Sequence, residues 1–197
     1  VRSIAVDKNR GRVYALSQNT VKGGEGSTIF SFNYHTGEYL ADVFVSNSLN
    51  TPRSLAVDGS GNVVLADGGS LRFFSPSLVQ SFAWSEGATS NFYAVSAVGN
   101  RLFARTEDEV ATYAIGATGF QFLGAVLFPA PTSEVVMNAM GDRMLMGEGT
   151  VVRRFDVAPN IPAFLGTAIS NQNTTVTGVA FGHGNRHYQL RTNTTTL

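Results

Sequence analysis

The stretch Ser3-Ile-Ala-Val-Asp7, followed by Arg12-Val-Tyr-Ala-Leu16, recurs along the chain. Its second copy reads Ser54-Leu-Ala-Val-Asp58, followed by Asn62-Val-Val-Leu-Ala66. Weaker copies begin at Tyr93, Glu134 and Thr177. Glycines in the turns that follow the first run of each copy are on average about 43 residues apart, and they are Gly11, Gly61, Gly99, Gly141 and Gly184. The chain is therefore a repeat protein with five units.

Each unit divides into short apolar runs separated by turn residues. In the second unit the runs are 54–58, 63–67, 70–74 and Leu78–Trp84, with glycines or Pro76 between them. No window shows a sustained helical period. A period in the forties with four strands per unit predicts an all-β fold, a β-propeller of four-stranded antiparallel blades. The blades are expected at about 1–49, 50–90, 91–131, 132–172 and 173–197 of a single domain.

The fifth unit is short and contains two runs, Thr177–Phe181 and Arg186–Arg191. Four complete blades and the start of a fifth are therefore predicted. Propellers close by completing one blade with strands from both termini, which removes exposed sheet edges. Because residues 3–7 already form an inner strand, we expect the chain to be part of a larger propeller. Irregular closure, or strand pairing with another chain, is the alternative.

The composition excludes or disfavours several classes of function. A formal net charge of zero argues against nucleic acid as a partner, because binding to phosphates needs clustered positive charge. The chain contains no cysteine, which rules out disulfides and zinc–thiolate sites. No apolar run is long enough to span a membrane. With charged residues at only 14%, the surface is rich in Ser, Thr and Asn, which favours an extracytoplasmic or cell-surface protein.

The phrase Ser-Ile/Leu-Ala-Val-Asp, then Gly, then Val-Tyr/Val, resembles NHL repeats and the related gluconolactonase-like propellers. The resemblance covers 3–16 and 54–67; in the later units the Asp after the inner strand is replaced by Gly99, Gly141 and Gly182. It implies a ligand face built from the loops that enter each inner strand and the loops that join the second and third strands. Polar candidates there, including two from the inserted loop 18–27, are Lys22, Glu25, Asn50, Arg53, Glu86, Asn91, Glu107, Glu134, Glu148 and Asn173.

Two other sets of residues receive structural roles. Asp7 and Asp58 follow inner strands and are predicted to accept hydrogen bonds from turn amides. The aromatic side chains of the third and outer strands are predicted to pack between blades, and they include Phe30, Phe32, Phe73, Phe74, Phe82, Trp84, Phe120 and Phe122.

No catalytic set can be assigned from these residues, so the predicted function is a noncatalytic scaffold that binds a protein or a small-molecule ligand without a cofactor. The alternative is a divalent-metal-dependent hydrolase or lactonase. The resemblance implies a cation, such as calcium, held in the central channel by oxygen ligands, with Glu86, Asn91, Asn138 or Glu134 as candidates. RNA binding, as in some NHL propellers, is a third hypothesis that the neutral charge disfavours.

Overall fold

The computed structural model describes residues 1–19, 26–46, 52–85, 91–128, 135–170, 174–182 and 186–193. In this part of the chain all regular structure is β: there are 18 strands and no helix. They form four antiparallel sheets of four strands and one sheet of two strands, and in each sheet the strands lie side by side in chain order. The predicted propeller architecture, four complete blades and the start of a fifth, is confirmed.

Each blade is one of these sheets. The first contains β1 (Ser3–Asp7), β2 (Arg12–Asn19), β3 (Gly26–Asn33) and β4 (Tyr39–Ser46). The second contains β5 (Pro52–Val57), β6 (Val63–Asp67), β7 (Ser70–Phe74) and β8 (Gln80–Ser85). The third contains β9 (Ala94–Val98), β10 (Arg101–Arg105), β11 (Glu109–Ile115) and β12 (Phe120–Leu127). The fourth contains β13 (Val135–Met140), β14 (Arg143–Glu148), β15 (Val151–Asp156) and β16 (Ala163–Ser170). The fifth contains β17 (Thr174–Phe181) and β18 (His187–Asn193).

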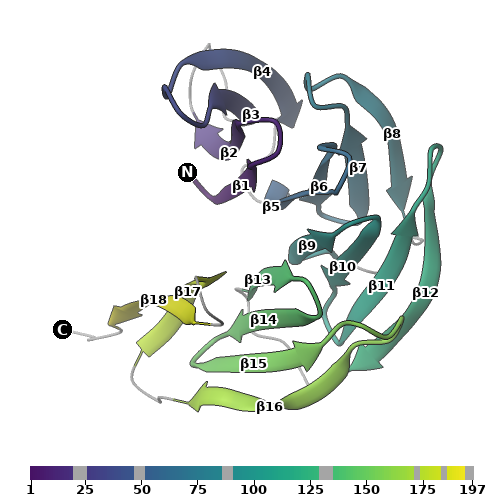
Figure 1. The fold of residues 1–197 in the computed structure, drawn as a ribbon, viewed down its shortest axis with the longest axis vertical. Helices are drawn as coiled ribbons and strands as arrows, with labels where there is room; N and C mark the ends of the chain where they lie inside the picture. The colour runs from purple at the N-terminus through teal and green to yellow at the C-terminus, as the bar shows by residue number, and fades with distance from the viewer. Residues whose placement is uncertain are drawn as a thin grey trace.

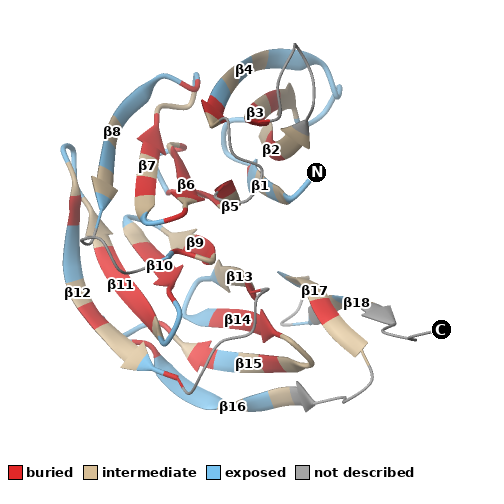
Figure 2. Cartoon of the chain, turned by 180° about the vertical axis from the view of Figure 1, so that it is seen from behind, coloured by how far each residue is buried: buried red, intermediate tan, exposed pale blue. Residues whose placement is uncertain are grey.

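The blades follow one another around an open centre and form an arc (Figure 1). The first strand of each blade, β1, β5, β9, β13 or β17, lies nearest the centre, and the fourth strands lie at the periphery. The two termini lie on the same side, where the first and fifth blades bound the gap in the arc. Buried residues concentrate on the middle strands of the second, third and fourth blades (Figure 2).

The core is divided into layers between neighbouring blades. One layer joins the first and second blades through Tyr14, Leu16 and Ile29 on one side and Leu65 and Phe74 on the other. Burial in this layer raises the pKa of Tyr14 above its ordinary value of 10.0. Two more layers join the second to the third blade and the third to the fourth, and a smaller one joins the fourth to the fifth. Because strand side chains alternate between faces, the second strands of the second, third and fourth blades each contribute to two layers at once.

Serine side chains add polar contacts between the inner strands. In each case a serine hydroxyl on the inner strand of one blade accepts a hydrogen bond from a backbone amide on the inner strand of the next blade. Without this bond the amide would face the centre unpaired. The three bonds are Leu55 N to Ser3 Oγ at 2.9 Å, Val95 N to Ser54 Oγ at 3.1 Å, and Ala139 N to Ser96 Oγ at 2.7 Å. The first serine of the repeated Ser-Ile/Leu-Ala-Val phrase, Ser3 or Ser54, therefore joins neighbouring blades in the first two units, and Ser96 does so in the third.

The outer strand of the second blade begins later than predicted. Leu78, expected to start that strand, lies in a turn with φ of +64°, and β8 begins at Gln80. The Leu78 amide donates to the Ser75 carbonyl at 2.9 Å, and the Val79 amide donates to Ser75 Oγ at 3.2 Å. A left-handed leucine is unusual, but this turn buries its side chain in the layer between the first and second blades.

Aromatic packing between blades is confirmed for the second and third blades. The ring centroids of Phe82 and Phe120 are 5.3 Å apart, and those of Trp84 and Tyr113 are 5.1 Å apart. The prediction is wrong for Phe122, which is 52% exposed although its ring contacts Tyr113. Phe30 and Phe32 lie on the face of the first blade that points away from the second blade, where no described blade covers them.

Candidate functional site

The centre of the arc opens into two cavities, one at each end of the inner strands. The first, of about 440 Å³, lies where these strands begin. The second, of about 540 Å³, lies where they end. Both are bounded by several blades, so residues from distant repeats meet there. Ligands of ring-shaped and barrel-shaped folds commonly bind at such openings.

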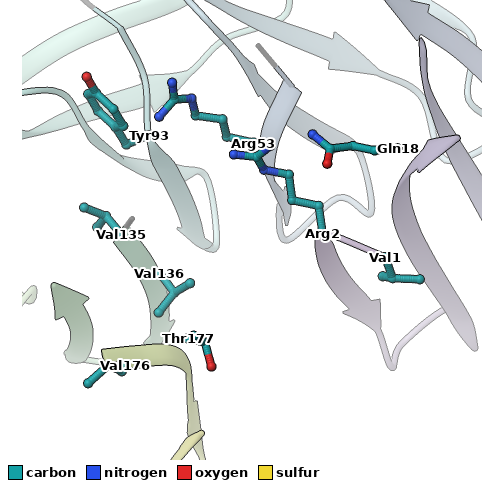
Figure 3. A pocket seen from close by; sticks show the side chains of 9 residues that line it. All are labelled: Val1, Arg2, Gln18, Arg53, Tyr93, Val135, Val136, Val176 and Thr177. Carbon is teal, nitrogen blue, oxygen red and sulfur yellow. The ribbon is translucent and has the colours of Figure 1, made fainter. Parts of the chain in front are cut away.

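Arg53 and Tyr93 lie in contact with each other in the lining of the first cavity. The guanidinium carbon of Arg53 lies 4.4 Å from the centre of the Tyr93 ring, a cation–π contact between the second and third blades. Arg53 Nε is buried and has no hydrogen-bond partner among the described residues. Figure 3 shows the Arg53 side chain extending toward Tyr93, with Arg2 and Gln18 on the same side of the cavity. The opposite side is formed by Val135, Val136, Val176 and Thr177.

A bulge in the inner strand places Arg53 in this cavity. The register of β5 against β6 shifts between Pro52 and Ser54, so Arg53 has no partner opposite it. An extra residue in one strand leaves the ladder and is redirected. Pro52 at the start of the strand has no amide hydrogen to contribute to the ladder, which is compatible with the irregularity.

The second cavity has a different chemistry. Its lining includes the carboxylates of Asp7 and Asp58 and the amide of Asn138, whereas the first cavity has no acidic side chain among its described lining residues. Asp58 Oδ1 accepts hydrogen bonds from the amides of Ser60 at 2.9 Å and Asn62 at 2.8 Å. Asp7 Oδ1 accepts one from the Arg10 amide at 3.1 Å. The prediction that both aspartates stabilise turns is confirmed.

Three of the remaining predicted ligand-face residues are described, and none of the three lines either cavity. Asn91 is exposed and does not line either cavity. Glu107 is exposed in the turn between β10 and β11. Glu148 is buried in an ion-pair network described below. The other six residues lie outside the described residues, and they are Lys22, Glu25, Asn50, Glu86, Glu134 and Asn173.

A buried ion-pair network joins the third and fourth blades. Arg105, at the end of β10, is 0% exposed, and its Nη2 donates to Glu148 Oε1 at 2.8 Å. Arg153 Nε donates to the other carboxylate oxygen, Oε2, at 3.1 Å. Arg105 Nη1 also donates to the Thr106 carbonyl at 2.7 Å. These partners engage both oxygens of Glu148, so this carboxylate has a structural role.

The network was not predicted from the sequence, although a signal was present. Arg105 and Glu148 are 43 residues apart, which equals one repeat. Both residues end the second strand of their blade, β10 or β14, so they lie at the same end of neighbouring blades and can meet across a layer. A related pair within the second blade joins Arg72 and Asp67 at 3.2 Å, and Arg153 and Glu148 stand in the same relation within the fourth blade.

Among the described residues, no three His, Asp or Glu side chains are grouped so that they could hold a metal ion. The described part of the chain also has no helix long and apolar enough to cross a membrane.

The fold defines the chain as a β-propeller, and solved structures agree. It is similar to a 6-phosphogluconolactonase candidate from Bacteroides uniformis, with a TM-score of 0.67 and 15% identity, covering 96% of this chain and 64% of that one. It is also similar to hydrazine synthase from Kuenenia stuttgartiensis, with a TM-score of 0.66 and 11% identity, covering 91% and 52%. The WD40 repeats of RRP9 give a TM-score of 0.58 and 11% identity, covering 89% and 56%.

These likenesses show the fold alone, because proteins with unrelated functions share it. The chain spans between about half and two thirds of the length of each of these structures. No family model and no curated protein matches the sequence.

Proposed function

We propose that this propeller is a noncatalytic scaffold that binds a protein or a small-molecule ligand over the first cavity. The observation that carries this proposal is the Arg53–Tyr93 pair at the end of the central opening. The stack restricts the guanidinium, so less conformational entropy is lost when a ligand is bound. The valines across the cavity offer an apolar surface beside it. Together they fit a partner with both an acidic and an apolar group.

The chemistry of Arg53 indicates the group that it would bind. Guanidinium pairs most strongly with carboxylate or phosphate, through two parallel N–H donors. No acidic side chain is among the described residues that line the first cavity. A carboxylate or phosphate on the partner would therefore bind the Arg53 guanidinium without displacing a competing carboxylate of that lining.

The wider context of the proposal follows from the composition and the repeats. We propose membership in the NHL-like group of propellers and an extracytoplasmic or cell-surface location, on the repeated phrase and the low charge. The WD40 neighbours favour a protein as the partner. Pairing of the β17–β18 sheet with further blades or another chain is also part of the proposal.

Replacing Arg53 by methionine tests the site. Inorganic phosphate and citrate serve as probes, and each should raise the melting temperature of the wild-type protein by mass action. A charged hydrogen bond contributes about 1.5–3 kcal/mol, so the variant should bind the probes roughly 10- to 100-fold more weakly. Arg154→Met is the matched control, because Arg154 is exposed on β15 and lies outside this cavity. Equal probe binding by wild type and Arg53→Met would contradict the proposal.

A metal-dependent lactonase is the second candidate, favoured by the likeness to the 6-phosphogluconolactonase candidate. Calcium or another divalent ion in the central channel would then stabilise the folded state. Under the scaffold proposal, calcium chloride leaves the melting temperature unchanged and glucono-δ-lactone hydrolysis stays at the buffer rate. A calcium-dependent rise in both melting temperature and hydrolysis would establish the enzyme instead. Sodium chloride at matched ionic strength is the control.

A further inference from the structure

The first blade has an apolar face that no described residue covers. This face points away from the second blade and toward the gap in the arc (Figure 1). Ile4 is 61% exposed, Val6 43% and Phe44 56%. Phe30 and Phe32 lie on the same face, half-buried, with their ring centroids 6.4 Å apart. We propose that this face is an interface for a further four-stranded blade of the same polypeptide, which closes the arc into a ring.

The internal repeats show what such a face does elsewhere in the molecule. In the first blade, Val6, Val13 and Phe32 lie side by side on three neighbouring strands. The equivalent trios are Val57, Val63 and Phe74, then Ala97, Leu102 and Tyr113, then Ala139, Met144 and Phe155. In these three trios the second and third residues are all 0% exposed. The same surface that is buried in three blades is open in the first.

The burial of these equivalents has one common cause. In each case the face is covered by the opposite face of the preceding blade: the first covers the second, the second covers the third, and the third covers the fourth. The first blade already uses its other face, through Tyr14, Leu16 and Ile29, against the second blade. Its open face therefore corresponds to the face that, in the next three blades, packs against the preceding blade.

The other end of the arc has the matching feature. The fifth blade has two described strands, β17 and β18, where the others have four. Beside it, the fourth blade borders a cavity of about 500 Å³ that Leu145, Leu165 and Phe181 help to line. Leu165 is 47% exposed. The outer strands of a complete fifth blade would pack in this position. Both ends of the arc can therefore accommodate further strands of a propeller.

A blade of the same polypeptide fits these observations better than a second copy. Head-to-tail pairing of two copies would bring the two-stranded sheet of one against the first blade of the other, whereas each equivalent face meets a four-stranded sheet. Pairing of two first blades would place like faces together, which none of the three layers between four-stranded blades does. The similar solved structures also have additional chain, because this chain spans only 52%, 64% and 56% of three of them.

The test uses the absence of cysteine from the chain. Phe44→Cys places a single thiol on the open face, and Glu38→Cys places one in the exposed turn between β3 and β4 as a control. Both variants are made in the native polypeptide, and alkylation rates are compared. We expect an intact mass above 21.0 kDa. We also expect the Phe44→Cys variant to be labelled at least roughly tenfold more slowly than the Glu38→Cys variant, because a buried thiol reacts only after local opening.

Three results would overturn the proposal. These are equal labelling rates for the two variants, an intact mass of 21.0 kDa with a monomeric light-scattering mass, and protection of the Phe44→Cys thiol only at concentrations where a dimer forms. The last would assign the face to a second copy. None of them depends on Arg53, so the proposed ligand site stands or falls separately.

Discussion

Glu148→Ala is expected to destabilise the protein by about 3–5 kcal/mol, because it leaves a buried arginine without its counterion. Arg105 is 0% exposed, and Glu148 is its only carboxylate partner among the described residues. Equilibrium unfolding in urea measures the loss as a lower transition midpoint.

Two controls separate the buried charge from other effects of the substitution. Arg153→Met removes the other partner of Glu148, but its side chain is 22% exposed, so the loss should be no more than about 1 kcal/mol. The double variant Arg105→Met, Glu148→Leu removes both buried charges and should recover most of the stability. If Glu148→Ala costs no more than Arg153→Met, the network does not stabilise the layer as described.

Phe155→Ala is expected to cost about 3–5 kcal/mol, because it removes a fully buried ring from the same layer. The Phe155 ring lies 5.3 Å from that of Phe128, between centroids, and 5.7 Å from that of Phe164. Neighbours fixed in two sheets cannot move together to fill the space left by the ring. Urea unfolding of the 197-residue chain measures the effect.

The repeat provides a matched control for this substitution. Phe32 occupies the equivalent position in the first blade but lies on the open face. Phe32→Ala in the same chain should cost less than half as much as Phe155→Ala, since a side chain that is already in contact with solvent loses less on truncation. Equal losses for the two variants would show that the face of the first blade is covered in the 197-residue chain.

Local features of the repeat were predictable because they depend on neighbouring residues. The predicted bounds of β6 and β7 are those of the structure, since alternating apolar residues and glycine turns specify both. Leu78 was misplaced for a tertiary reason. Its left-handed conformation is unfavourable locally and is compensated by burial against the first blade.

The candidate site was only partly predictable. Arg53 was identified because it precedes a repeated inner strand, and the structure places it in the first cavity. Its partner Tyr93 was not selected, because the two meet across blades and no short-range pattern connects them. Glu148 was selected as a ligand-face residue, whereas its partner Arg105, one repeat away, was overlooked. Contacts between blades join residues far apart in the chain, so a reading of single repeats does not identify them.

The sequence by itself determined the fold class, the number of units and the strand order, because periodic apolar runs and glycine turns act within each repeat of the chain. Only the tertiary structure decided which polar residues face the central opening and which are used between blades. It also revealed that one face of the first blade is left open. These features depend on how one blade packs against the next, and that packing brings together side chains that are a whole repeat apart.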